Sequence, residues 1–356
     1  MSLEHAPTGL GNEALVENKD FLPMVPVKNK VEWVDKDVHL PFSLEVGEST
    51  PIGMFLSPAP EKGEHTYELE VEPDHGRSGM LGRVIFQDNE GRLYRDIDLK
   101  GMGYISFPET GKPPIVDKVA ITSAIRGRAE GIQTIGRALL DLRRTKLFLG
   151  LGIRTQRILA MIRLNEIIGE RGEHISIADA RRKKILNAGE EDEPVVMVRA
   201  YGTRGRISEV ANTESSIAKT KLEDARRLVA QELKIDPEDL TWGKYLGWFM
   251  ESMGKNIGRM HGNGWIHSFL TDHNMTLDAR VIDLDSVQQL TSKKIKGTPR
   301  GMAKDLADSQ KYLSELCLEV NKIGHLSDSD EKLTENMLEI FRREYREEYE
   351  KVQMTA

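Results

Sequence analysis

The sequence predicts an α+β protein with two lobes, in which a β-rich N-terminal lobe precedes a helical C-terminal lobe. Two observations predict this order. Residues 66–71 alternate between polar and apolar side chains and residues 194–199 are almost continuously apolar, and both patterns are typical of strands. Apolar residues then recur at helical spacing over 242–260, 302–323 and 331–353, all in the last part of the chain.

Composition sets further bounds. The 356 residues can form two cores, and we divide them into an N-terminal arm (1–40), a nucleotide-binding β-rich lobe with a long helix (41–200) and a helical lobe (201–356). A net charge of −7 argues against a nucleic-acid partner, and no apolar run approaches the ~20 residues of a membrane span. The single cysteine, Cys317, is typical of a cytoplasmic protein, because it allows no internal disulfide.

The β-rich lobe contains a glycine turn followed by a lysine. Three glycines at a spacing of three, among them Gly79 and Gly82, precede Arg83 and an apolar strand. The backbone of such a loop can approach a phosphate closely, although a flexible β-turn fits the spacing equally well. A hairpin turn follows, and the returning strand ends at Lys100. Protein kinases have the same order of parts, and their lysine binds nucleotide phosphates; an exposed strand-end lysine is the alternative.

A kinase-like lobe also needs an acid on the next helix to orient this lysine. In the long helical region over 122–149, Glu130 is the first choice and Asp141 the second. Further along, Arg199 and Arg206 flank a glycine-rich loop at the end of a strand. Their fork-shaped guanidinium groups suit a phosphate, whereas a solvated turn is the alternative interpretation.

The residues 261–285, HGNGWIHSFLTDHNMTLDARVIDLD, indicate a metal site. Asn274 and Asp283 are separated by a tight turn and can both present oxygens to one Mg²⁺ ion. Protein kinases build their metal site from a catalytic-loop Asn and an Asp on the following strand. Their base is an Asp five residues before that Asn, and here Phe269 occupies this position. The alternative is a buried turn in which the Asn is a cap and the Asp forms a salt bridge.

Taken together, these motifs resemble the selenoprotein O family of pseudokinases. The matching pieces are DLKGMG around Lys100, TSAIR, LGLGIRTQR, VVMVRAYGTRGR and HSFLTDHNMTLDARVID, which occur in this order over about residues 76–285. The resemblance implies a two-lobed protein-kinase-like fold that binds ATP in a flipped orientation with Mg²⁺ or Mn²⁺. It also implies transfer of AMP to Ser, Thr or Tyr hydroxyls of a protein substrate and of the protein itself.

The resemblance assigns a role to each motif residue. Lys100 and the helix acid would hold phosphates, Arg199 and Arg206 would bind the phosphate end of the nucleotide, and Asn274 and Asp283 would hold the metal.

The family's base is an Asp immediately before the metal Asn. Here His273 occupies that position and Asp272 precedes it. Histidine can accept a proton near neutral pH. Because adjacent residues in an extended loop point in opposite directions, we expect only one of the two to face the cleft. A phosphotransferase and an inactive nucleotide-binding pseudokinase scaffold remain the alternative functions.

Overall fold

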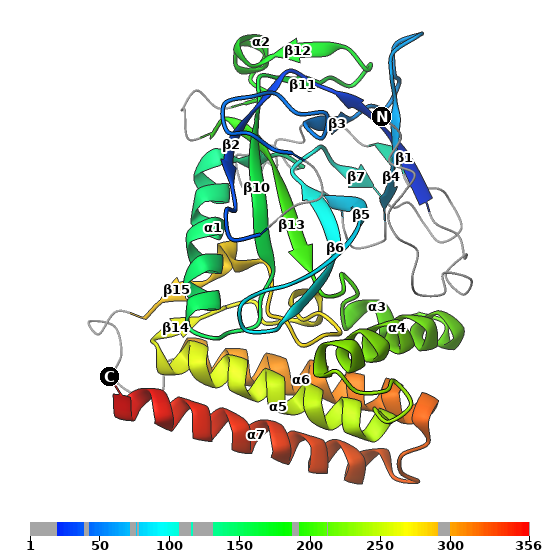
Figure 1. Cartoon of the computed structure of the whole chain (residues 1–356), viewed down its shortest axis with the longest axis vertical. Helices are drawn as coiled ribbons and strands as arrows, with labels where there is room; N and C mark the ends of the chain where they lie inside the picture. Colours follow the sequence, from blue (N-terminus) through cyan, green and yellow to red (C-terminus); the bar gives the residue numbers. More distant parts are fainter. Residues whose placement is uncertain are drawn as a thin grey trace. The chain divides into compact units, whose positions relative to one another are not determined.

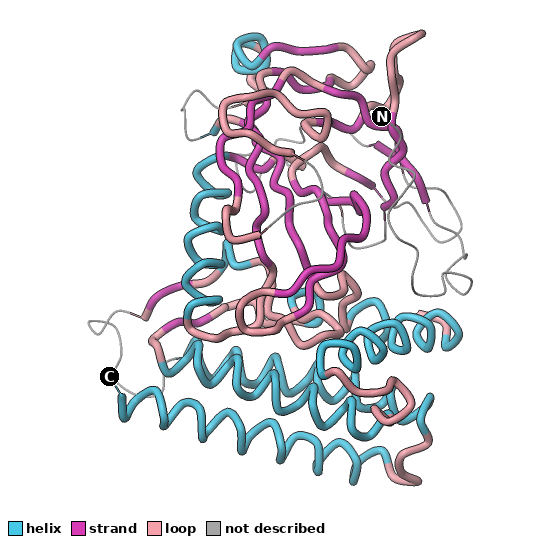
Figure 2. Tube along the Cα trace, in the orientation of Figure 1, coloured by secondary structure: helices cyan, strands magenta, loops and turns pink. Residues whose placement is uncertain are grey.

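The computed structural model describes residues 20–38, 43–71, 76, 78–106, 115–116, 131–186, 192–211, 213–290 and 300–355. They belong to two compact units (Figures 1 and 2). The first comprises Met1–Phe86, Arg95–Leu142 and Arg157–Ala200, and the second comprises Gln87–Tyr94, Arg143–Gln156 and Tyr201–Ala356. Strands dominate the first unit and helices the second, so the predicted α+β class is confirmed.

One large sheet organises the first unit (Figure 2). Its strands lie in the order β2 (Asn29–Val34), β10 (Arg157–Leu164), β13 (Pro194–Tyr201), β6 (Leu93–Lys100), β5 (Ser78–Gln87), β4 (Tyr67–Val71), β1 (Asp20–Pro26) and β3 (Met54–Leu56), and β9 (Gln133–Thr134) also pairs with β13. The pairings of β10 with β2 and β13, and of β1 with β3 and β4, are antiparallel.

The middle strands explain why this sheet forms. All eight residues of β13, PVVMVRAY, are buried, as expected for a continuous apolar run covered on both faces. Helix α1 (Ile135–Gly150) packs against this part of the sheet, with Ala138 and Leu142 in one apolar cluster with Ile158 and Val195. Apolar contacts with α1 therefore hold strands β10 and β13 in place.

The expectation of a loose N-terminal arm over residues 1–40 is wrong for most of the described part, because β1 and β2 lie in the sheet. Met24 and Val25 are fully buried, and Met24 stands opposite Tyr67 of β4. Two prolines, Pro23 and Pro26, lie in this strand. Strand β1 tolerates them because the apolar positions between them gain partners from distant strands.

Smaller elements complete the first unit. They are β7 (Ile105–Ser106), β8 (Ile115–Val116), β11 (Glu166–Ile168), β12 (His174–Ser176) and α2 (Ile177–Arg182). β7 pairs with β8, and β11 pairs with β12.

The second unit has a helical core. Its helices are α3 (Ser208–Ala211), α4 (Ser215–Leu233), α5 (Trp242–Gly262), α6 (Arg300–Gly324) and α7 (Asp330–Thr355), and β14 (Trp265–Ile266) pairs with β15 (Gln288–Gln289). The expected helices over 242–260, 302–323 and 331–353 correspond to α5, α6 and α7. Within the described ranges, no helix is long and apolar enough to cross a membrane.

Helix α5 is the centre of this core. Thr241 caps its N-terminus by accepting a hydrogen bond from the backbone of Lys244. Gly254, Gly258 and Gly262 lie on one face and bring α7 very close. A Cβ atom at Gly258 would lie 2.6 Å from a backbone oxygen of α7, so only glycine allows this spacing. The loop that follows α5 thus begins from a tightly packed helix.

Candidate functional site

Strand β6 carries four charged side chains that are buried. Arg95, Asp96, Asp98 and Lys100 are each at most 7% exposed. Because side chains alternate along a strand, Asp96, Asp98 and Lys100 share one face. Buried charges cost stability unless they are paired, and each of these four has an ionic partner. Three of the four buried charges of β6 therefore lie on one face of the sheet.

Lys100 is the last of these residues, and its Nζ lies 3.9 Å from Oδ2 of Asp141 on α1. Asp141 is fully buried and the Lys100 side chain is 3% exposed, which rules out an exposed strand-end lysine. Asp141 was the second choice of acid from the sequence. The first choice, Glu130, lies outside the described residues. Among the described residues, Asp141 is thus an acid that the structure brings to the lysine.

Arg199 of β13 has a partner that its spacing did not predict. Its Nε and Nη2 donate to the two carboxylate oxygens of Asp98 at 2.9 and 2.6 Å. Both side chains are buried, so this is a two-pronged ion pair between neighbouring strands. The pair fixes the Arg199 side chain, and its binding to nucleotide stays a prediction.

Gly79, Gly82 and Arg83 lie in strand β5, so the expected loop conformation is wrong. A Cβ atom at Gly79 would lie 2.2 Å from the Leu69 side chain, so this glycine permits a close approach of β4. Gly82 has a φ of +156° and faces open space. Arg83 Nε lies 3.3 Å from Oδ1 of Asp96. Nucleotide binding by these three residues stays a prediction, now with a strand as its framework.

In the second unit, a buried aspartate of α6 holds the start of the loop after α5. Asp305 is fully buried and accepts the backbone N–H groups of His267 at 2.6 Å and of Ser268 at 2.9 Å. The ring of His261, in the last turn of α5, lies 3.4 Å from the same carboxylate. One carboxylate thus satisfies two amides and fixes the position of the loop.

His267 connects this loop start to the segment before Asp283. Its Nε2 lies 2.8 Å from the carbonyl oxygen of Ile282, so Nε2 carries the proton and donates it. Burial lowers the pKa of His267, although the bond to Ile282 opposes this shift. The neutral His267 ring therefore links the loop start to Ile282 by a hydrogen bond and carries no charge.

The two predicted metal ligands are brought together by a short antiparallel pairing. The backbone N–H of Ile282 donates to the carbonyl oxygen of Asn274 at 3.0 Å, so Asn274 lies opposite the residue before Asp283. Asn274 ends a short 3-10 helix, η2 (Asp272–Asn274). Its Nδ2 donates to the carbonyl of Phe269 at 2.8 Å. This bond leaves Oδ1 as the amide atom that can bind a cation.

Asp283 has a left-handed backbone, with φ 59° and ψ 55°. Few residues other than glycine adopt this conformation, although aspartate tolerates it comparatively well. It precedes a second 3-10 helix, η3 (Leu284–Ser286), and Ser286 Oγ donates to its carbonyl at 3.3 Å. Such strain costs about 1–3 kcal/mol and is often found at functional sites.

One amide oxygen and one carboxylate fit a Mg²⁺ ion that takes its other ligands from phosphate and water. Across the described ranges, no group of three or more His, Cys, Asp or Glu side chains could hold a metal. A cation at Asn274 and Asp283 would therefore need further oxygens from a nucleotide.

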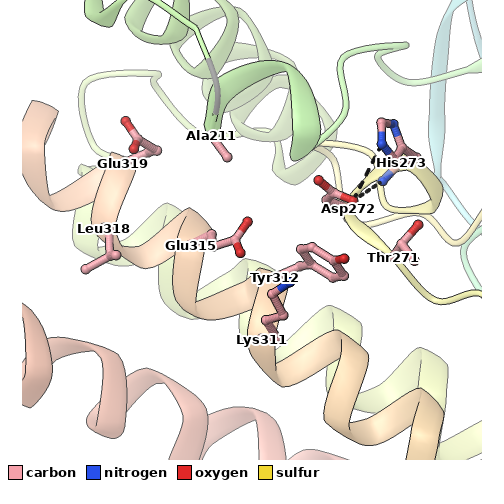
Figure 3. Close-up of a pocket in the computed structure, with 9 residues that line it drawn as sticks. All are labelled: Ala211, Thr271, Asp272, His273, Lys311, Tyr312, Glu315, Leu318 and Glu319. Atoms are coloured by element: carbon pink, nitrogen blue, oxygen red, sulfur yellow. Dashed lines mark hydrogen bonds and ion pairs between the residues drawn. The ribbon is translucent and has the colours of Figure 1, made fainter. Parts of the chain in front are cut away.

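The two base candidates line a pocket of about 510 Å³ (Figure 3). Asp272 is 7% exposed, and its Oδ1 accepts the backbone N–H of His273 at 3.1 Å. The His273 ring is half exposed, with Nε2 3.9 Å from the same oxygen. Both residues belong to the short helix η2 and both line this pocket, whereas the expectation that only one of them faces the cleft stays a prediction.

Arg206 lies in the second unit, and its backbone pairs with Thr276 of the loop. Its Nε is buried and has no hydrogen-bond partner among the residues that the structure describes. Buried donors are normally satisfied, so this one can accept a further partner. This observation fits, and does not test, the predicted role in phosphate binding.

Sequence reasoning missed a buried ionic cluster behind the loop. Arg280 is fully buried, and its Nε lies 2.6 Å from Oδ2 of Asp278. Its Nη1 donates to the carbonyl of Thr155 at 3.1 Å, and its guanidinium lies 4.2 Å from the centre of the Tyr94 ring. Asp278 lies in the same loop, but Thr155 and Tyr94 come from separate segments of the chain, so the sequence of the loop did not predict the cluster.

Asp305 was also missed, although a signal for it existed. It lies on the same helical face as Met302 and Ser309, which are buried with it. An aspartate within an apolar helical stripe must have a partner, because a buried carboxylate without one is costly. The sequence could therefore have marked Asp305 as an anchor, without naming the amides that it holds.

Comparisons with known proteins concern the fold. No protein-family model and no curated protein matches the sequence. Among solved structures, the chain is similar to the crystal structure of a Toxoplasma gondii specific rhoptry antigen kinase domain, with a TM-score of 0.36 and 9% identity. This likeness covers 83% of the present chain and 84% of the other. A likeness this distant carries no argument about function. The functional argument depends on the residues described above.

Proposed function

We propose that this protein is an ATP-dependent protein adenylyltransferase that modifies hydroxyl groups of a protein substrate and of itself. The observation that carries the proposal is the geometry at Asn274. Its amide nitrogen donates to the carbonyl of Phe269 and leaves Oδ1 available, its backbone oxygen accepts the N–H of the residue before Asp283, and two proton acceptors precede it in the lining of a pocket. The resemblance to the selenoprotein O family supports AMP as the transferred group.

Each residue has a defined part in this proposal. Lys100, ion-paired with Asp141, binds nucleotide phosphate as a fixed positive charge. Asn274 and Asp283 hold Mg²⁺ or Mn²⁺, and the bound cation neutralises phosphate charge as it develops.

In the reaction, the substrate hydroxyl oxygen bonds to the α-phosphorus, and the bond from that phosphorus to the bridging oxygen breaks. Pyrophosphate leaves, and the hydroxyl proton passes to His273 or Asp272.

Phe269 argues against an ordinary phosphotransferase. A kinase base would stand at this position, and a phenyl ring accepts no proton. The ring is 57% exposed and lies 5.7 Å from the ammonium of Lys304. The remaining alternative is an inactive pseudokinase scaffold, in which His273 has replaced the base without taking over its role.

Transfer of label from ATP separates these functions. The protein is incubated with Mg²⁺ or Mn²⁺ and with ATP labelled at either the α- or the γ-phosphate. Incorporation from the α position alone supports adenylyl transfer. Incorporation from the γ position shows a kinase, and incorporation from neither favours the scaffold, so both of these outcomes contradict the proposal.

Two variants test the assigned residues. Asp283→Ala should abolish metal-dependent ATP binding, whereas Asp285→Ala, which removes a nearby carboxylate, should preserve it. For the phosphate site, Lys100→Met combined with Asp141→Leu removes both buried charges and keeps apolar volume, so the fold should survive. Thermal unfolding monitors the fold, and calorimetry with Mg²⁺–ATP measures binding. Unchanged affinity in Asp283→Ala or in the double variant would refute the corresponding assignment.

A further inference from the structure

The pocket beside the base candidates has two walls of different origin (Figure 3). Asp272 and His273 of η2 form one wall, and α6 provides the other through Tyr312, Glu315 and Glu319. In Figure 3 the Glu315 carboxylate is directed from α6 toward the loop that carries Asp272. Asn274 is the last residue of the same 3-10 helix, so the first wall adjoins the predicted metal site.

Two carboxylates in this pocket keep oxygens that no described residue contacts by a hydrogen bond or ion pair. Asp272 is 7% exposed, and its Oδ2 accepts no hydrogen bond from any residue that the structure describes. Glu315 likewise forms no hydrogen bond or ion pair with the described part of the chain. Two other charged side chains of the pocket have partners. Glu319 forms an ion pair with Lys322 at 2.6 Å, and the Lys311 ammonium lies over the Tyr312 ring, 4.7 Å from its centre.

The nearly buried Asp272 makes this arrangement more than a patch of acidic surface. The Asp272 side chain is only 10% exposed, and its Oδ2, which accepts no hydrogen bond from the described residues, belongs to a pocket large enough for protein side chains.

We propose that this pocket binds the acceptor segment of a protein substrate and selects a segment with an arginine close to the modified hydroxyl. The inference rests on the proposed adenylyltransferase function and adds the class of substrate. The hydroxyl donates to Asp272 Oδ2, next to the metal site. The arginine pairs with Glu315, because a guanidinium group offers a planar fork of donors that matches a carboxylate.

Peptide binding tests the pocket without any chemistry. The probe is a short fluorescein-labelled peptide with one serine and one nearby arginine, and its binding to the full chain is followed by fluorescence anisotropy. A second peptide carries glutamine in place of the arginine. The arginine peptide should bind at least about tenfold more tightly, as one charge-assisted hydrogen bond predicts. No measurable binding, or equal binding of both peptides, overturns the proposal.

A pair of variants locates the effect. Glu315→Gln should remove the preference for arginine, whereas Glu339→Gln should keep it, because Glu339 is an exposed residue of α7 that does not line the pocket. Glu315→Lys should reverse the preference toward a peptide that carries glutamate in place of the arginine. This gain of binding cannot result from unfolding. Equal losses in Glu315→Gln and Glu339→Gln, or no reversal in Glu315→Lys, contradict the assignment to Glu315.

The failure of this inference and that of the proposed function give different results. If α-labelled ATP modifies the protein but the peptides bind equally, adenylyl transfer stands and the substrate class is wrong. If the arginine preference depends on Glu315 but no label is incorporated from the α position, the pocket selects basic segments and the proposed reaction is wrong.

Discussion

Removing the carboxylate of Asp305 should loosen the loop that carries the predicted metal site. In the Asp305→Ala variant, the backbone N–H groups of His267 and Ser268 lose acceptors at 2.6 and 2.9 Å. Each amide left without a partner costs about 1–3 kcal/mol, so the free energy of unfolding should fall by about 2–6 kcal/mol. Asp305→Asn keeps one acceptor oxygen and should lose about half of this amount.

The matched control is Asp308→Ala in the same helix. Asp308 pairs with Lys304 at the surface, and an exposed ion pair contributes only about 0–1 kcal/mol. Urea unfolding gives the free-energy differences, and calorimetry with Mg²⁺–ATP reports on the metal site. Asp305→Asn should weaken metal-dependent ATP binding more than Asp308→Ala does, because the loop start is displaced. Equal stability of Asp305→Ala and Asp308→Ala would refute the anchoring role.

Three further predictions concern packing and pH. Gly258→Ala should lower stability by about 1–3 kcal/mol in urea unfolding, because its Cβ would lie 2.6 Å from a backbone oxygen of α7. Gly247→Ala, in the same helix but facing open space, should instead raise stability by about 0.5–1 kcal/mol; a similar change in both would refute the packing argument. Burial opposes the charged form of His174, but hydrogen bonds to Glu64 and Glu166 outweigh it and raise the pKa of His174. Its contribution to stability is therefore complete below about pH 6.5 and lost as the pH rises through the folded-state pKa, and His174→Gln should remove that part of the pH dependence of the melting temperature.

The sequence alone determined the elements whose pattern is local. The apolar run of β13 and the helical spacing of α5, α6 and α7 are set by residues close together in the chain. The closeness of Asn274 and Asp283 was predictable for the same reason, because a tight turn separates them. The unusual residue at the kinase base position, Phe269, could also be read directly.

The tertiary structure decided everything that depends on partners from distant segments. It made strands of residues expected in an arm, since β1 and β2 gain their pairing from β4 and β10. It brought Asp141 to Lys100, paired Arg199 with Asp98, and placed Asp305 under the loop. A sequence pattern shows which side chains are charged, but only packing decides which of them are withdrawn from water and must meet.

The orientation of the base candidates was likewise settled by the fold. Adjacent residues diverge in an extended chain, but Asp272 and His273 lie in the 3-10 helix η2, and both line the same pocket. That turn ends at Asn274, whose side chain donates a hydrogen bond to the carbonyl of Phe269 and whose carbonyl accepts one from the N–H of Ile282. The order of residues along the chain therefore determines which groups lie near the predicted metal site. Backbone hydrogen bonds between loop segments decided where those groups point, because a local pattern holds no information about a turn imposed by its neighbours.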